Sequence, residues 1–266
     1  MKPLIEIHDM EASDEYFVGT CTHTHESEEI DLSASRRLAW LRVMYEKGSR
    51  VMVATLDGKQ AGFLHVIPIE FSPWGPLGRD LLVIPCLCSV NKGHGVGKLL
   101  LAAAEQEARH QGRKGIVTIG YYHDFWYMPA SFFEANGFFK CERPRQERSS
   151  AKNTAAVLWR VFDEHTEAPV LLKPKYEFKP IRRKVVIDLF WNAFCQTSNI
   201  EAQRVREVAA EFGDSVALNE YCADDRLVLL RNQIPRGIFI DGHEIYWGYE
   251  APKDGIRQAI AQGLRE

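Results

Sequence analysis

The chain has 266 residues and a formal net charge of −3, because 36 acidic residues outnumber 33 basic ones. This balance excludes the broad basic surface used by many nucleic-acid and membrane-binding proteins, so neither partner is expected. The length suits two domains, each large enough to bury its own core. The N-terminal residues contain no apolar signal-peptide core, and no apolar run reaches membrane-spanning length, which predicts a cytoplasmic protein.

Strand and helix patterns alternate through the first half of the chain. Strands are expected at residues 4–8, 51–56, 60–71, 81–90, 115–122 and 155–162, and helices at 13–20, 32–47, 98–109 and 129–135. Ser13 is expected to cap the first helix, and Gly48 to end the second. Asp57-Gly58, between the second and third strands, is a strong signal for a two-residue hairpin turn.

The most informative segment is Lys92-Gly93-His94-Gly95-Val96-Gly97-Lys98, which joins a buried-type strand to a helix. A glycine-rich turn at a helix N-terminus presents unpaired backbone N–H groups, and these groups and the helix dipole attract an anion. Glycine also lets a pyrophosphate approach the backbone closely. The turn therefore predicts a phosphate-bearing ligand, although glycines at helix starts also occur for tight packing alone.

Two common phosphate motifs do not fit this turn. A nucleoside triphosphate loop requires Ser or Thr where Leu99 stands. A dinucleotide loop requires G-x-G-x-x-G, whereas Gly93, Gly95 and Gly97 are spaced by two residues throughout. The turn instead resembles the acetyl-coenzyme A loop of the GNAT family of N-acetyltransferases, Q/R-x-x-G-x-G/A, with Lys92, Gly95 and Gly97 at its positions.

A second motif carries the same resemblance. Residues 132–138, F-F-E-A-N-G-F, are similar to the family's L-Y-E-K-x-G-F segment. The resemblance implies an α/β (α+β) fold with a mixed-sheet domain over residues 1–163, and acetyl-CoA as the cofactor. It also implies that the cofactor is held by the loop and by the backbone of the strand before it. The implied residues are Leu87, Cys88, Val90, Lys92, Gly93, His94, Gly95, Val96, Gly97 and Lys98.

Acyl transfer to an amine needs a deprotonated nucleophile, a stabilised oxyanion and a proton for the departing thiolate. The resemblance implies a Tyr as proton donor, but Phe133 stands at that position and has no proton to donate. Tyr127 or Tyr122 is the hypothesised replacement, with core packing or lining of the substrate pocket as the alternative. Cys88 is a candidate acyl carrier, with an inert buried thiol as the alternative.

The strand before the loop offers no Glu as a general base. Glu70 or His65 could act through water, or the amine could lose its proton before binding. Cys21, His23 and His25 alternate along one segment and are of metal-ligand type, but they suit a loop or the border of the acceptor site better. No metal is expected, because the six cysteines show no zinc-type spacing and should be free thiols in a reducing compartment.

The second half begins with residues 164–181, whose three prolines predict an extended linker. A second domain is expected over residues 182–266. Its strands are expected at 185–191, 216–221, 237–242 and 243–249, with helices that end at 212 and 264. Asp241-Gly242 again predicts a hairpin turn.

This layout resembles the thioredoxin fold. Cys195 takes the place of the nucleophilic cysteine at a helix N-terminus, Ser198 replaces the second cysteine of C-x-x-C, and Pro235 takes the place of the cis-proline. A helix N-terminus lowers a thiol pKa, so Cys195 could exchange as a monothiol. A binding or scaffold role is the alternative and is favoured, because a resolving cysteine is missing. Together the two halves resemble acetyltransferases with a C-terminal YoaP-type thioredoxin-like domain.

The sequence therefore predicts an enzyme, an acetyl-CoA-dependent N-acetyltransferase that acts on an amine of a small molecule or peptide. The alternative is a redox, sensor or interaction protein that uses Cys195, with the first domain as a reader of acyl-CoA. The acceptor and the oligomeric state are left open by the sequence.

Overall fold

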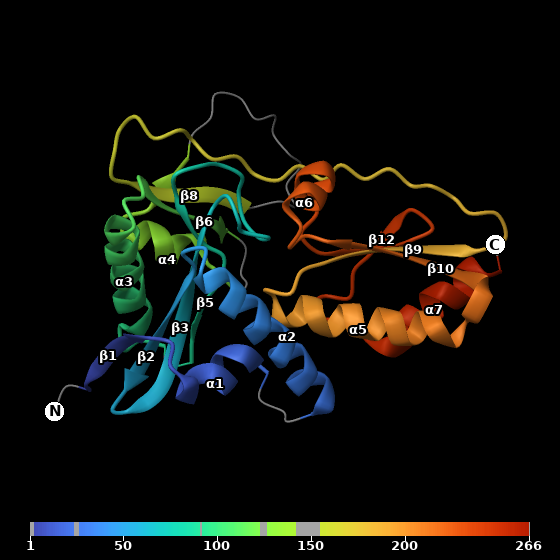
Figure 1. Ribbon diagram of the computed structural model, residues 1–266, viewed down its shortest axis with the longest axis horizontal. Helices are drawn as coiled ribbons and strands as arrows, with labels where there is room; N and C mark the ends of the chain where they lie inside the picture. Colours follow the sequence, from blue (N-terminus) through green and yellow to red (C-terminus); the bar gives the residue numbers. More distant parts are fainter. Residues whose placement is uncertain (1–2, 24–26, 91, 123–126, 142–154, 266) are drawn as a thin grey trace. The chain divides into compact units, whose positions relative to one another are not determined.

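The computed structural model describes residues 3–23, 27–90, 92–122, 127–141 and 155–265 (Figure 1). The chain divides into two compact units, Met1–Val18 with Arg42–Leu172 and Gly19–Leu41 with Lys173–Glu266. Residues 19–41 thus group with the C-terminal part of the chain, although the sequence suggested a first domain over 1–163. The boundaries at residues 163 and 182 stay predictions for independently folding domains.

The first unit is built on an eight-stranded mixed sheet. Its strands are β1 (Ile5–Asp9), β2 (Arg50–Leu56), β3 (Lys59–Pro68), β4 (Leu82–Ile84), β5 (Leu87–Ser89), β6 (Gly115–Tyr121), β7 (Phe139–Lys140) and β8 (Ala155–Val161). The strand order is β1-β2-β3-β4-β6-β8-β7, and β5 pairs with β3. β4 and β6 run parallel, and the other pairs are antiparallel.

The helices in the N-terminal part of the chain are η1 (Ala12–Asp14), α1 (Glu15–Thr20), α2 (Glu28–Tyr45), α3 (Val96–His110) and α4 (Ala130–Ala135). Most of α2 groups with the second unit. α3 packs against β1, β2, β3 and β6 and covers one face of the sheet (Figure 1). It does so because apolar residues recur at helical spacing and are buried: Val96, Leu100, Ala104 and Ala108. The predicted mixed α/β class is confirmed.

Local turn chemistry was predicted better than helix starts. Asp57 (φ 50°) and Gly58 (φ 76°) both have the left-handed backbone that a two-residue hairpin requires, which confirms the predicted turn. The cap predicted at Ser13 is wrong. Glu11 instead precedes the helical turn and forms a capping box with Asp14, whose carboxylate accepts the Glu11 N–H at 3.1 Å.

The second unit contains a four-stranded sheet of order β10-β9-β11-β12. Its elements are β9 (Val185–Trp191), α5 (Gln196–Glu211), η2 (Gly213–Ser215), β10 (Val216–Cys222), α6 (Arg226–Asn232), β11 (Gly237–Ile240), β12 (His243–Ile245) and α7 (Lys253–Gly263). β9 and β10 are parallel, whereas β11 runs antiparallel to both β9 and β12. The predicted turn at Asp241-Gly242 is present, with φ values of 45° and 84°.

The two faces of this second sheet are covered differently. Val185, Ile187 and Leu189 point to one face and pack in a core with residues of α5 and α7. Asp188 and Phe190 point to the other face, along which the extended segment after residue 173 runs (Figure 1). Within the part of the chain that the structure describes, no helix combines the length and apolar character needed to cross a membrane.

Candidate functional site

The glycine turn forms the N-terminus of α3. Gly93 (φ 84°) and Gly95 (φ 87°) both have left-handed backbones, and a Cβ atom on either would meet no atom within 4 Å. The backbone conformation, and not packing, therefore requires these two glycines. Gly95 is the N-cap of α3 and offers no side-chain cap, so the first N–H groups of the helix remain available to a ligand or to water.

Gly97 has a different role from the other two glycines. A Cβ atom there would lie 2.9 Å from Cζ of Phe132, so Gly97 permits close packing of α3 against the α4 ring. Val96 is buried, with 1% of its surface exposed. Lys92, His94 and Lys98 are exposed around the turn, and the two lysines add positive charge beside the N–H groups.

The strand predicted at 81–90 is divided by Pro85 and Cys86 into β4 and β5. β4 pairs with β3 and also runs parallel to β6 as far as Ile84, which lies opposite Thr118. β5 pairs only with β3 among the described strands. Because Pro85 has no N–H group, it cannot extend the ladder with β6. The sheet therefore opens between β5 and β6, directly before the glycine turn.

The pairing register decides which backbone groups of β5 face this opening. The N–H of Val90 donates to the carbonyl of Ala61 at 2.9 Å, so it is turned toward β3. Because bonded and non-bonded pairs alternate in an antiparallel ladder, Cys88 also bonds toward β3, whereas Leu87 and Ser89 turn their N–H and C=O groups away. The expectation that Cys88 and Val90 present their backbone groups to a ligand is therefore corrected, while the expectation for Leu87 fits this geometry.

Tyr127 contacts the break between β4 and β5, which is formed by Pro85 and Cys86. Its hydroxyl donates to the carbonyl of Pro85 at 2.7 Å, and the hydroxyl of buried Thr118 donates to the carbonyl of Ile84 at 2.7 Å. These two bonds satisfy carbonyl groups that a continuous ladder would otherwise have used. The half-buried Tyr127 hydroxyl thus combines a structural contact with a position at the edge of the opening.

Tyr122 has a different environment. It is 45% exposed, and its hydroxyl donates to Glu134. Partial burial, together with the hydrogen bond and charge of Glu134, raises the pKa of Tyr122 to about 12. A phenol that holds its proton this firmly is a poorer acid, so the geometry favours Tyr127 over Tyr122 as proton donor.

The other candidates for acid, base or carrier lie in packed surroundings. Phe133 is fully buried, with its ring 5.3 Å from Phe132 and 5.4 Å from Phe138. Cys88 is 8% exposed and His65 is 0% exposed. The Glu70 carboxylate accepts the N–H of Asp80 at 2.7 Å and pairs with Arg113 at 3.1 Å. Glu70 therefore secures the fold around it and is poorly placed to act as a base.

In the second unit, Asn192 forms hydrogen bonds to the three residues predicted from the sequence, Cys195, Ser198 and Pro235. Its Oδ1 accepts the N–H of Cys195 at 2.9 Å, and its Nδ2 donates to the carbonyl of Pro235 at 2.8 Å. Its own N–H donates to Oγ of Ser198 at 3.0 Å. The sequence did not single out Asn192. The expected cis-proline is also corrected, because the peptide bond before Pro235 is trans.

The thiol of Cys195 is not activated by its position before α5. Burial raises the pKa of this thiol, against the lowering influence of Arg236, of the Ser198 backbone and of Arg37. The direction is opposite to the one expected for a cysteine at a helix N-terminus. Burial therefore opposes the activation that a helix N-terminus would otherwise give the Cys195 thiol.

His23 also belongs to the second unit, where its Nε2 bonds to Glu250 and its Nδ1 lies 3.0 Å from the carbonyl of Thr20. Burial alone would lower the pKa of His23, but the hydrogen bond and charge of Glu250 outweigh it and raise this pKa. The pKa of Glu250 is lowered by His23 and by nearby Arg204, against the effect of burial. His25 lies outside the described residues, and among those described no group of three or more potential metal ligands occurs.

The free energy of unfolding is expected to fall as the pH rises above about 6.5, the ordinary pKa of a histidine. The raised pKa of His23 means that its contribution is complete below the unfolded value, about 6.5, and is lost as the pH rises through the folded value. Urea unfolding of the wild type and of His23→Gln at several pH values checks this. The difference between the two proteins should shrink with rising pH, and a constant difference would contradict the assignment.

Comparison with known proteins gives structural likeness only. No protein-family model and no curated protein matches the chain. It is similar to ribosomal-protein-alanine N-acetyltransferase from Brucella melitensis, with 18% identity over 59% of this chain and 99% of that one, at a TM-score of 0.43. It is also similar to a GNAT-family acetyltransferase from Staphylococcus aureus, with 15% sequence identity. That match covers 60% of this chain and 100% of the other, at a TM-score of 0.42. A third similar structure is a GNAT-family acetyltransferase from Brucella melitensis in complex with acetyl-CoA, with 12% sequence identity. That match covers 62% of this chain and 93% of the other, at a TM-score of 0.39.

Proposed function

We propose that the first unit is an acetyl-CoA-dependent N-acetyltransferase of the GNAT type, which acetylates an amine of a small molecule or peptide. The observation that carries the proposal is that two structural features follow one another along the chain, the opening of the sheet beside β5 and the glycine turn before α3. β5 leaves the neighbourhood of β6, and an open glycine turn at the N-terminus of α3 follows directly. The first feature turns the backbone N–H and C=O groups of Leu87 away from β3, and the second offers N–H groups to an anion.

The residues present fit a coenzyme A thioester. Gly93, Gly95 and the first turn of α3 would hold the pyrophosphate, with Lys92 and Lys98 supplying positive charge. The outward N–H and C=O groups of Leu87 would pair with the amide-bearing arm, as a sheet edge pairs with an added strand. Bound acetyl-CoA would supply an acyl group attached to a thiol that leaves readily.

The chain's own contribution is to hold the acyl end of the cofactor and to deliver one proton to the departing thiolate. The backbone beside Leu87 orients the acyl end in the opening of the sheet. The Tyr127 hydroxyl holds a proton at the edge of that opening and is the proposed donor to the departing thiolate. Since Glu70 and His65 are engaged or buried, we propose that the amine binds in its neutral form.

Tyr127→Phe is expected to lower kcat at least about tenfold, because a positioned general acid contributes about 10²-fold or more. Tyr122→Phe is the matched control and should leave kcat within about twofold, since its hydroxyl bonds to Glu134. Thiol release during steady-state turnover measures both. Loss of the alkaline limb of the pH profile in Tyr127→Phe identifies proton donation, whereas an unchanged profile or equal effects in both variants would contradict it.

The proposal itself is tested by calorimetric titration with acetyl-CoA, followed by a screen of amines for thiol release. Micromolar binding and turnover with at least one amine class are expected. An absence of acetyl-CoA binding would overturn the assignment. We further propose that the protein is cytoplasmic. Its net charge of −3 supports the proposal that it has no nucleic-acid or membrane partner.

For residues 182–266 we propose a thioredoxin-like domain of the YoaP type in a binding role. The order β10-β9-β11-β12, with α5 connecting two parallel strands, supports this fold. The raised pKa of Cys195 and the Ser at position 198 argue against thiol exchange as its activity.

A further inference from the structure

A pocket of about 690 Å³ lies within the second unit, on the sheet face opposite α5 and α7. β9 and β10 form its floor, and the extended segment around residues 175–181 and the end of α6 form its walls. Its volume is in the range of small-molecule sites. The residues that the argument uses are Tyr176, Asp188, Phe190, Asn219, Tyr221 and Arg231.

A buried carboxylate stands on the floor of this pocket. Asp188 is 4% exposed and accepts hydrogen bonds from the Tyr176 hydroxyl at 2.7 Å, Asn219 Nδ2 at 2.9 Å and the Tyr221 hydroxyl at 3.4 Å. All three donors are neutral, and within the described ranges no Lys or Arg forms an ion pair with Asp188. A buried charge without a counter-ion is costly, and its two oxygens can accept a further donor.

Aromatic rings surround this carboxylate. The ring of Tyr176 stacks on Phe239 with centroids 4.1 Å apart, and the ring of Tyr221 stacks on Phe190 at 4.7 Å. Burial and the adjacent Asp188 raise the pKa of both tyrosines, so their hydroxyls keep their protons and donate them to the Asp188 carboxyl group. A carboxylate between aromatic faces is suited to a positively charged nitrogen.

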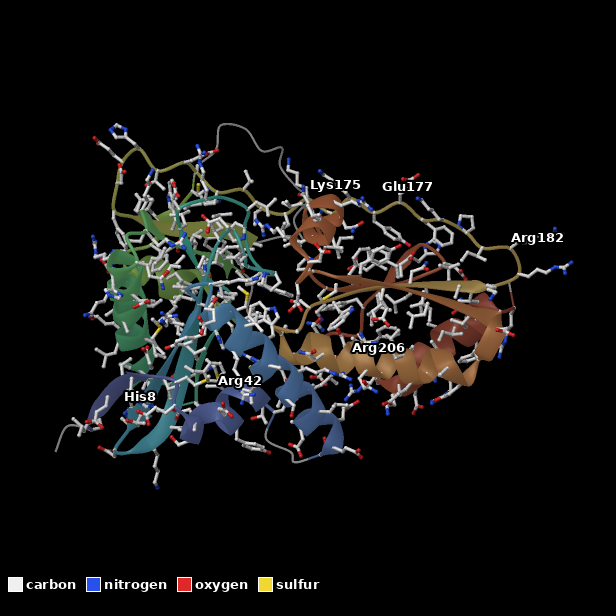
Figure 2. All side chains as sticks on the ribbon, viewed as in Figure 1. His8, Arg42, Lys175, Glu177, Arg182 and Arg206 are labelled. Carbon is white, nitrogen blue, oxygen red and sulfur yellow. The ribbon has the colours of Figure 1, made fainter. Side chains whose placement is uncertain are left out.

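The rim of the pocket carries the opposite charge. Lys175, Lys179 and Arg231 are exposed and line it, together with the single acidic residue Glu177. Figure 2 shows Lys175 and Glu177 on the extended segment that borders the sheet. A simple cation would be repelled by this rim, and a simple anion would be repelled by Asp188. A molecule with a positive inner end and a negative outer end satisfies both.

We propose that this pocket binds a small zwitterion of the amino-acid class, with its ammonium group at Asp188 and its anionic group toward Lys175, Lys179 and Arg231. The aromatic rings beside Asp188 contact the ammonium group and the adjoining apolar body of the ligand. This site is additional to acetyl transfer and gives the second unit a ligand of its own.

Calorimetric titration of the full chain with each standard L-amino acid, without acetyl-CoA, tests the proposal. At least one is expected to bind with a Kd below about 1 mM. For the tightest one, the analogue without its carboxylate and the analogue without its amino group should each bind at least about tenfold more weakly. If no amino acid binds, or if either analogue binds equally well, the proposal is overturned. Neither result bears on acetyl-CoA binding, which is measured separately.

Two variants separate ligand binding from a purely structural role of Asp188. Asp188→Asn should weaken the binding of the amino acid at least about tenfold, while the thermal unfolding of the variant stays cooperative. If this variant does not fold, Arg231→Gln serves, because Arg231 is exposed and contributes only to the rim. Arg231→Gln should weaken the binding of the amino acid about threefold or more and leave the binding of the carboxylate-free analogue unchanged. Unaltered amino-acid binding in the variants that fold would overturn the proposal.

Discussion

Gly95→Asp is expected to weaken acetyl-CoA binding at least about 100-fold, which corresponds to about 2.7 kcal/mol. The new carboxylate would stand at the N-cap of α3, where the first N–H groups of the helix have no side-chain partner. It would either repel the pyrophosphate or occupy the same N–H donors itself. Titration calorimetry on the purified variant measures the change directly.

Gly112→Asp is the matched control for this change. Gly112 has φ 66° at the other end of α3, and a Cβ there would also meet no atom within 4 Å. Both substitutions therefore impose a similar left-handed strain of about 1–2 kcal/mol on an exposed position. Only Gly95→Asp should lose binding, with Gly112→Asp within about twofold of the wild type. Equal losses would mean that helix destabilisation, and not the anion site, causes the effect.

Features fixed by local chemistry were predictable from the sequence. The turns at Asp57-Gly58 and Asp241-Gly242 need two consecutive left-handed residues, and this dipeptide supplies them wherever it occurs between strands. The glycine turn before α3 is of the same kind, because positive φ at Gly93 and Gly95 depends on the loop itself.

Features that depend on distant partners were not predictable. The apolar run at 81–90 predicts one strand, although Pro85 interrupts it, because nothing local tells which neighbouring strand each part pairs with. The direction of the Val90 N–H depends on its register with Ala61, far away in the sequence. Likewise, burial reverses the pKa shift that the helix N-terminus predicts for Cys195.

One signal was present in the sequence and was missed. Asp188 is the only charged residue in the otherwise apolar strand at 185–191, and a charge there is unusual for a buried strand. Its partners Tyr176 and Asn219 come from an extended segment and from another strand, so the cluster itself needed the fold. The interrupted pattern alone was enough to nominate Asp188 as a residue with a role beyond packing.

Glu201→Gln is expected to lower the free energy of unfolding by about 3 kcal/mol or more. Glu201 is 7% exposed, and its carboxylate accepts two bonds from Arg236, at 2.6 and 2.9 Å, and one from the N–H of Ala251 at 2.9 Å. Removing only the charge leaves the Arg236 guanidinium largely buried without its counter-ion. Urea unfolding followed by circular dichroism measures the loss.

Glu211→Gln is the control, because it removes the same kind of two-bond pair from the same helix. Glu211 bonds to Arg257 at 2.7 and 2.8 Å, but the two side chains are 46% and 39% exposed, so only a small loss is expected. Adding Arg236→Met to Glu201→Gln should recover part of the stability, since the uncompensated charge disappears with the arginine. If the two glutamate variants lose equal stability, or the double variant recovers none, burial of the Arg236 charge is not what makes Glu201 important.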